Sequence, residues 1–185
     1  MLHAMKTLLI ALLILTAGCS MRPRDKFRVE MDPAFSAEQQ EDLLQAMQDW
    51  QTSVAPDPLI LDVWIGDEYC SRSACNDVIT IHPSDLETVE ALGDNSNSED
   101  LGVTIYNWHP NAFEGEVYWA DIYLIPKADS TEHSTAVWNQ ETRHELGHAF
   151  GLNHTGPGSV MCKNAVCASE EISAEDVWQF RQVRK

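Results

Sequence analysis

The sequence predicts an α+β fold in which a twisted mixed sheet of about four to five strands packs on a long N-terminal helix. Three or more strand-like segments lie between two long helix-like segments, without the regular alternation of β-α-β units. The chain has 185 residues, of which 44% are hydrophobic and 22% are charged. These values are typical of one globular domain, and no internal repeat or second linker divides the body of the chain.

Residues 1–18 have the pattern of a signal peptide. Lys6 precedes an apolar run at 7–17, which is shorter than the roughly 20 residues that a transmembrane helix needs. The run ends in Leu15-Thr16-Ala17-Gly18-Cys19, which resembles the cleavage box of bacterial lipoproteins. The resemblance implies cleavage before Cys19, a lipid on its sulfur, and attachment to the bacterial outer membrane or cell surface. The alternative is an ordinary signal peptide, which would leave a secreted or periplasmic protein.

The charge balance argues against nucleic acid as the main partner. Lys and Arg number 12 against 29 Asp and Glu, which gives a formal net charge of −17. Binding to nucleic acid phosphates needs clustered cations, and so does electrostatic adhesion to anionic lipids. We therefore expect a soluble, self-repelling surface that a lipid on Cys19 would hold at the membrane. Nothing in the sequence indicates the oligomeric state.

The cysteines that follow the cleavage box predict two disulfides. They are Cys70, Cys75, Cys162 and Cys167, an even number in a chain that is expected to be exported. The two C-x4-C spacings favour local loops, Cys70–Cys75 and Cys162–Cys167, with cross-pairing as the alternative. A second metal site is less expected, because cysteine pairs that bind zinc are usually spaced C-x2-C.

A capping box predicts the start of the first helix. Ser36 is a suitable N-cap residue, and Gln39 follows it three positions later. Pro56 and Pro58 end the helix. Its buried face is predicted from apolar residues at helical spacing, namely Leu43, Met47, Trp50 and Val54.

Short apolar runs predict the other elements of a single domain at 28–185, which follows a polar tether at 19–27. The polar segment 93–100 resembles a calcium loop only loosely, because it lacks alternating oxygen ligands and a central glycine. We expect it to be solvated surface, so a calcium ion is unsupported. The predicted strands lie at 59–65, 78–81, 101–106 and 116–125, with a short helix at 84–92.

The chemistry is concentrated at residues 144–154, His-Glu-Leu-Gly-His-Ala-Phe-Gly-Leu-Asn-His. Positions four apart on a helix lie about 40° apart around its axis, so His144 and His148 project from one face and can share one metal ion. Gly151 can adopt a left-handed conformation that ends the helix. The chain can then bring His154 back to the same metal ion.

Three histidines leave the fourth position of a zinc ion for water, which is the arrangement of a catalytic zinc site. Zinc lowers the pKa of that water toward about 7. Glu145 is adjacent to a ligand but is not needed as one. Its carboxylate can therefore act as the general base and then pass the proton to a leaving amine.

The complete pattern H-E-x-x-H-x-x-G-x-x-H at 144–154 resembles the signature of the metzincin clan of zinc metallopeptidases. The resemblance implies an active-site helix and a methionine turn beneath the zinc, to which Met161 corresponds. Within the clan, Leu101–Thr104 and Ser173–Asp176 resemble matrixin segments, the second of them the start of a C-terminal helix. A peptide substrate would then pair along the strand at 116–125, taken as the sheet edge.

We therefore expect an exported, lipid-anchored endopeptidase with one catalytic zinc ion, whose substrate is a protein or peptide. His144, His148 and His154 would hold the zinc, and Glu145 would be the general base. The alternative is a non-catalytic lipoprotein that binds zinc and retains the metzincin fold. The presence of Glu145 favours the enzyme, because binding of zinc alone would not require it.

Overall fold

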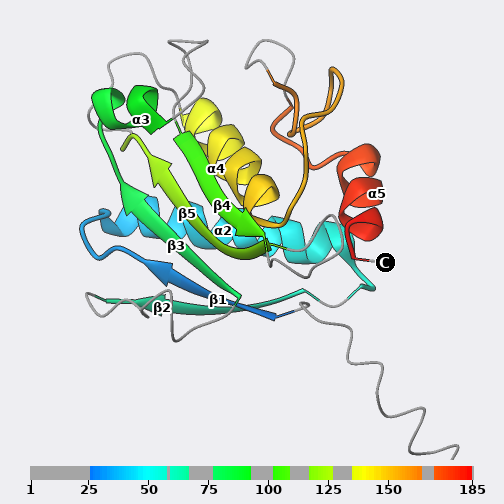
Figure 1. Cartoon of the computed structure of the whole chain (residues 1–185), viewed down its shortest axis with the longest axis horizontal. Coiled ribbons are helices and arrows are strands. Elements are labelled where there is room, and N and C mark those ends of the chain that lie inside the picture. The colour runs from blue at the N-terminus through cyan, green and yellow to red at the C-terminus, as the bar shows by residue number, and fades with distance from the viewer. Residues whose placement is uncertain are drawn as a thin grey trace, which may run out of the picture.

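A five-stranded mixed sheet and four helices make up the described part of the chain (Figure 1). The computed structural model describes residues 26–57, 59–66, 77–92, 102–108, 117–126, 135–163 and 169–184. The predicted signal peptide, most of the predicted tether, the segment 93–100 and four cysteines lie outside these residues: Cys19, Cys70, Cys75 and Cys167. Within the described residues, the predicted α+β class with a mixed sheet is confirmed.

The sheet has the strand order β2-β1-β3-β5-β4. The pairings β1–β2, β1–β3 and β3–β5 are parallel, and only β4 runs antiparallel to its neighbour β5. The strands are β1 (Lys26–Met31), β2 (Ile60–Ile65), β3 (Val78–Pro83), β4 (Gly102–Trp108) and β5 (Val117–Leu124). The helices are α2 (Ala37–Val54), α3 (Leu86–Leu92), α4 (Thr135–Ala149) and α5 (Ala174–Gln182).

The expectation that the strand at 116–125 is the sheet edge was wrong. That strand is β5, which pairs with β3 on one side and with β4 on the other. Its side chains Ala120, Ile122 and Leu124 are each about 1% exposed, as suits an interior strand. On this side of the sheet the edge strand is β4, because β5 lies between β4 and β3. A strand's apolar pattern reports its burial, but it does not specify the neighbours of that strand.

Strand β1 was not predicted from the sequence, although it is an inner strand of the sheet. Lys26 and Phe27, which were assigned to the tether, are its first two residues. Phe27, Val29 and Met31 alternate with polar residues and are buried in the main core. The alternation is that of a strand with only one face on the core, but its short length and charged residues obscure it.

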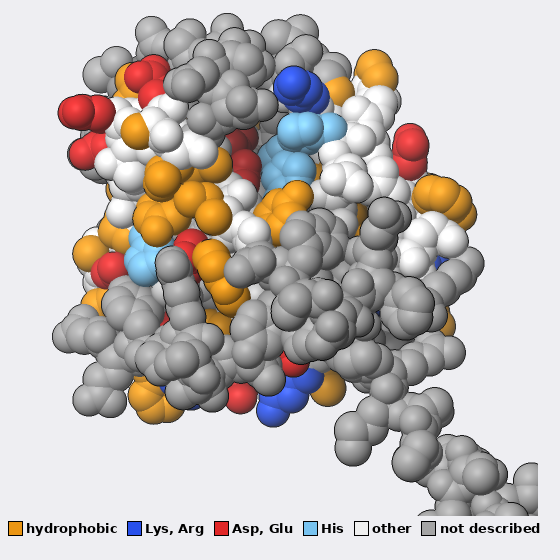
Figure 2. Space-filling model, viewed as in Figure 1, with side chains coloured by type: hydrophobic (Ala, Val, Ile, Leu, Met, Phe, Trp, Pro, Cys, Tyr) orange, Lys and Arg blue, Asp and Glu red, His pale blue; other side chains and the backbone are white. Residues whose placement is uncertain are grey.

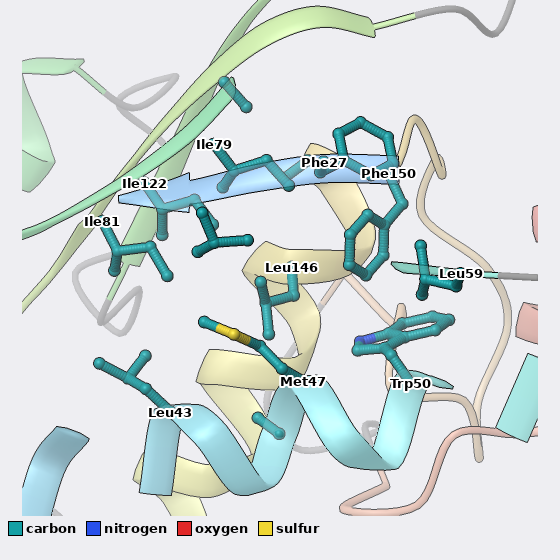
Figure 3. Packing of buried hydrophobic residues seen from close by; sticks show 14 of the residues in the cluster. Phe27, Leu43, Met47, Trp50, Leu59, Ile79, Ile81, Ile122, Leu146 and Phe150 are labelled. Atoms are coloured by element: carbon teal, nitrogen blue, oxygen red, sulfur yellow. The ribbon is translucent and has the colours of Figure 1, made fainter. Parts of the chain in front are cut away.

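Helix α2 has the predicted start and the predicted buried face. The Ser36 side chain accepts a hydrogen bond from the Gln39 backbone, and the Gln39 side chain accepts one from the Ser36 backbone. Leu43, Met47 and Trp50 point from α2 toward Leu146 of α4 and the apolar side chains of the sheet (Figure 3). Helices α2 and α4 therefore enclose the main core against one face of the sheet.

Two polar contacts fix α4 on α2. The indole Nε1–H of Trp50 donates a hydrogen bond to the backbone carbonyl of Arg143 over 2.9 Å. The guanidinium Nε–H of Arg143 donates one to Asp49 Oδ2 over 2.8 Å. Both contacts are made by Arg143 of α4, one residue before His144. The packing of α2 against α4 therefore helps to set the position of the histidines on α4.

None of the described helices combines the length and the apolar character that crossing a bilayer requires.

Replacement of Trp50 by alanine is expected to lower the free energy of unfolding by about 3–5 kcal/mol. The ring is fully buried and packs edge-on against Phe150 and stacked on Phe180, at centroid distances of 5.6 and 6.4 Å. Trp50→Phe keeps most of the ring volume and loses the Nε1–H donor, so a smaller loss is expected. Urea denaturation monitored by circular dichroism measures both changes.

Trp178→Ala is the matched control for this prediction. Trp178 is 60% exposed on α5, so its removal is expected to change the unfolding free energy by no more than about 0.5 kcal/mol. Equal effects of the two alanine substitutions would contradict the assignment of Trp50 to the core that carries α4.

Candidate metal centre

The backbone reverses direction at the C-terminal end of α4. Gly151 has a φ of +90°, in the left-handed region that favours glycine. The Leu152 N–H donates to the Gly147 carbonyl over 3.0 Å, and the Gly151 N–H donates to the His148 carbonyl over 2.8 Å. This pair of hydrogen bonds is the Schellman motif. The predicted role of Gly151 is therefore confirmed at the level of the backbone.

The three histidine rings converge on one point. His148 Nε2 lies 3.1 Å from His144 Nε2 and 3.2 Å from His154 Nε2. One nitrogen of each of the three rings lies within 4.8 Å of the others. Three nitrogens at about 2.0–2.1 Å from one tetrahedral zinc ion are about 3.3 Å apart, so the observed spacings are close to those of a zinc site.

The opposite nitrogens of two rings are fixed by backbone carbonyls. His144 Nδ1 lies 2.7 Å from the Val160 carbonyl oxygen, and His148 Nδ1 lies 2.8 Å from the Leu152 carbonyl oxygen. A carbonyl only accepts hydrogen bonds, so both Nδ1 atoms carry the proton and donate. In the neutral rings each Nε2 then presents a lone pair, and these two Nε2 atoms cannot hydrogen-bond to each other. A cation between them satisfies this arrangement, which is the usual support of histidine ligands to metals.

His148 and His154 are held in the neutral form that metal ligands require, because their pKa values are lowered. Burial lowers the pKa of His148 from 6.5 to about 4, and the neighbouring His144 acts in the same direction. Burial also lowers the pKa of His154 to about 4, with further lowering by His148 and His144. Lys163 adds to this effect, whereas the Glu145 carboxylate acts against it. The charge of Glu145 is therefore felt at the third ring.

Met161 forms an apolar floor against the last turn of α4. Its side chain is fully buried, and it lies so close to Gly147 that a Cβ on that glycine would be 2.2 Å from Met161 Sδ. Gly147 lies between His144 and His148, so Met161 packs directly against the helix segment that carries both ligands. Cys162, the next residue, is disulfide-bonded, and no other cysteine lies within the described residues.

A buried carboxylate connects α5 to the turn that precedes Met161. Asp176 accepts hydrogen bonds from the Ser159 hydroxyl and from the Val160 N–H, the latter over 3.3 Å. It also accepts from the Ser173 N–H over 2.7 Å, which completes the capping box of α5 and confirms Ser173 as the N-cap. Because the Val160 carbonyl accepts from His144, this network reaches the first ligand through a single residue, Val160.

Glu145 lies beside the histidines with its carboxylate held by β4. The residue is 4% exposed, and the Thr104 hydroxyl donates a hydrogen bond to Glu145 Oε2. Figure 2 shows histidine side chains in a hollow of the molecular surface, with an acidic surface on one wall of it. A carboxylate beside three imidazoles can exchange a proton with a molecule that enters this hollow.

The structure brings together all the residues predicted for the centre. His144, His148 and His154 lie around one point, the Glu145 carboxylate is near enough to raise the pKa of His154, and Met161 packs against Gly147. Sequence reasoning missed four supporting residues, because each acts through a contact that is distant along the chain: Gly102, Thr104, Gly147 and Asp176. Only Gly147 had a local signal, since glycine is unfavourable in the interior of a helix and needs a packing reason there.

Gly147→Ala is expected to lower the unfolding free energy by about 1–3 kcal/mol through overpacking against Met161 Sδ. The sign is opposite to helix propensity, by which alanine is favoured over glycine by about 1 kcal/mol. In the double variant Gly147→Ala/Met161→Ala the new methyl group has space. A double-mutant cycle measured by denaturation in a metal chelator should therefore show coupling of about 1 kcal/mol or more. Additive effects of the two substitutions would contradict the contact.

The stability of the metal-free protein is expected to fall as the pH falls from 6.5 to about 4. In this window the unfolded chain protonates His148 and His154, whose pKa values are about 4 in the folded protein. The unfolded state then binds more protons, so protonation favours unfolding. His148→Gln removes one of the two groups that take up a proton on unfolding. The unfolding free energy of this variant should therefore change less with pH than that of the wild type. Parallel curves would show that burial does not lower the pKa of His148.

No protein-family model matches the chain, and no curated protein sequence matches it at a significant level. The centre is therefore interpreted from its own geometry.

Proposed function

We propose that the protein is a zinc-dependent endopeptidase with a metzincin-like catalytic domain. The observation that carries the proposal is the convergence of three Nε2 atoms next to a buried carboxylate. Three neutral nitrogen ligands favour zinc and leave one position open, which is typical of catalytic rather than structural zinc sites. A site that only stores or binds zinc has no need of Glu145.

Several features outside the motif support the metzincin-like assignment. The resemblance implies a methionine beneath the ligands, and Met161 packs against α4 at Gly147. It also implies a C-terminal helix that starts at Ser173, where α5 has its N-cap. The mixed five-stranded sheet with α2 and α4 on one face is compatible with such a domain.

The residues of the chain divide the proposed reaction between them. When bound, zinc supplies Lewis acidity, which makes water more acidic and polarises a carbonyl group. Glu145 takes the proton from the attacking water and delivers it to the nitrogen of the leaving amine. His144 and His148 keep their orientation because their Nδ1–H groups are hydrogen-bonded to Val160 and Leu152. Water therefore attacks the peptide carbonyl while the acceptor of its proton is already in place.

Strand β4 is the expected docking edge for the substrate. It is the last strand of the sheet, next to Glu145, and within the described residues no strand pairs with its outer edge. An extended peptide can add to such an edge through main-chain hydrogen bonds, which require little of the substrate's sequence. This assignment replaces the strand at 116–125, which is paired on both sides.

Export and the lipid anchor on Cys19 stay predictions from the sequence, since residues 1–25 lie outside the described structure. We propose that the catalytic domain is held at the bacterial outer membrane or cell surface by that lipid. The negative charge of the chain is compatible with a soluble domain whose own surface does not adhere to anionic lipids.

Glu145→Gln is expected to lower kcat/KM for peptide hydrolysis by about a hundredfold or more, because the amide cannot accept the proton from water. Glutamine keeps the size of the side chain and an oxygen that can accept from Thr104. We therefore expect the variant to keep about one zinc ion per chain, as in the wild type. Hydrolysis is measured with a broad peptide library, and zinc by atomic absorption on the same samples.

Glu175→Gln on α5 is the matched control, since Glu175 is exposed in the first turn of that helix and should leave activity unchanged. Undiminished hydrolysis by the Glu145 variant would refute the proposed mechanism. A wild-type protein that binds zinc but cleaves no peptide of the library would instead support a non-catalytic zinc-binding lipoprotein.

A further inference from the structure

The side chain of Glu145 is held by a hydroxyl from a distant part of the chain. Thr104 Oγ1 donates a hydrogen bond to Glu145 Oε2 and lies 3.0 Å from the backbone carbonyl oxygen of the same residue. A hydroxyl has one proton, and an ionised carboxylate is a stronger acceptor than a neutral carbonyl. The proton therefore points chiefly at the carboxylate. Within the described residues, no other hydrogen bond reaches that carboxylate.

The same strand also confines the aliphatic part of Glu145. Gly102 lies two residues before Thr104 on β4, so the two positions face the same side of the sheet. A Cβ at Gly102 would lie 2.9 Å from Glu145 Cγ and 2.8 Å from Leu124 Cδ2. The absence of a side chain at this position lets α4 approach β4 closely. Both the stem and the carboxylate of Glu145 are thus fixed by β4.

We propose that Thr104 is a positioning residue for Glu145, an inference that rests on the proposed peptidase function. The Thr104 hydroxyl occupies Oε2 and stops rotation of the carboxylate. The other oxygen, Oε1, is then the one that faces water and takes its proton. Because Thr104 stands on β4, the strand that is expected to pair with the substrate is also the strand that orients the base.

Thr104→Val and Thr104→Ser separate the hydroxyl from the rest of the side chain. Valine keeps the shape and loses the donor, so kcat should fall by about tenfold or more, whereas KM should stay within about twofold. Serine keeps the donor and should retain kcat within about threefold of the wild type. Both variants should keep about one zinc ion per chain, since the candidate ligands are the three histidines and Thr104 is not one of them.

Thr142→Val is the matched control on α4. Thr142 is a buried threonine of the same helix as Glu145, and its hydroxyl donates to the Trp138 carbonyl rather than to the Glu145 carboxylate. The substitution is the same, so its kcat should equal that of the wild type. If Thr142→Val lowered kcat as much as Thr104→Val does, the positioning role proposed for Thr104 would be overturned.

Crystal structures of the wild type and the Thr104 variants, with and without zinc, provide a readout that does not depend on activity. We expect one carboxylate orientation in the wild type and in Thr104→Ser, and a rotated or multiple orientation in Thr104→Val. An unchanged orientation and kcat in Thr104→Val, or equal impairment of both variants, would overturn the inference. If the wild type hydrolyses no peptide, the peptidase proposal fails, and the carboxylate orientations still decide the role of Thr104.

Discussion

The centre depends on the chain reversal at Gly151. A helix that continued past this residue would carry His154 away from the first two rings, since a residue six positions after His148 would lie about 9 Å further along the axis and on another face of the helix. The positive φ of Gly151 ends α4, and it turns the Leu152 carbonyl back toward His148, which donates to it. One backbone conformation therefore both orients the second ligand and makes room for the third.

The remaining support for the centre comes from segments that follow in the chain. Asp176 of α5 holds Ser159 and Val160, and the Val160 carbonyl in turn fixes His144. The next residue, Met161, fills the space that Gly147 leaves open beneath the helix. Helix α5 is thus more than a cover of the core, because its first turn holds Val160, the residue whose carbonyl fixes the first ligand.

The sequence was sufficient where a structural signal is local. Helical periodicity placed His144 and His148 on one face, and glycine chemistry explained the turn at Gly151, because both depend on neighbouring residues only. Thr104 lies 41 residues from Glu145, so their contact follows from the order of strands and not from any spacing. For the same reason the edge strand was misassigned to β5, and β1 was overlooked because its apolar residues form too short a pattern.

The position of the centre at the C-terminal end of α4 has an electrostatic consequence. Aligned peptide dipoles give the C-terminal end of a helix a partial negative charge of about half an elementary charge, which its last carbonyl groups carry. Three imidazole ligands are neutral, so they leave the double positive charge of a zinc ion uncompensated. His148 lies in the last turn of α4, next to those carbonyls. The helix end therefore offsets part of the metal's charge and adds to the preference of this place for a cation.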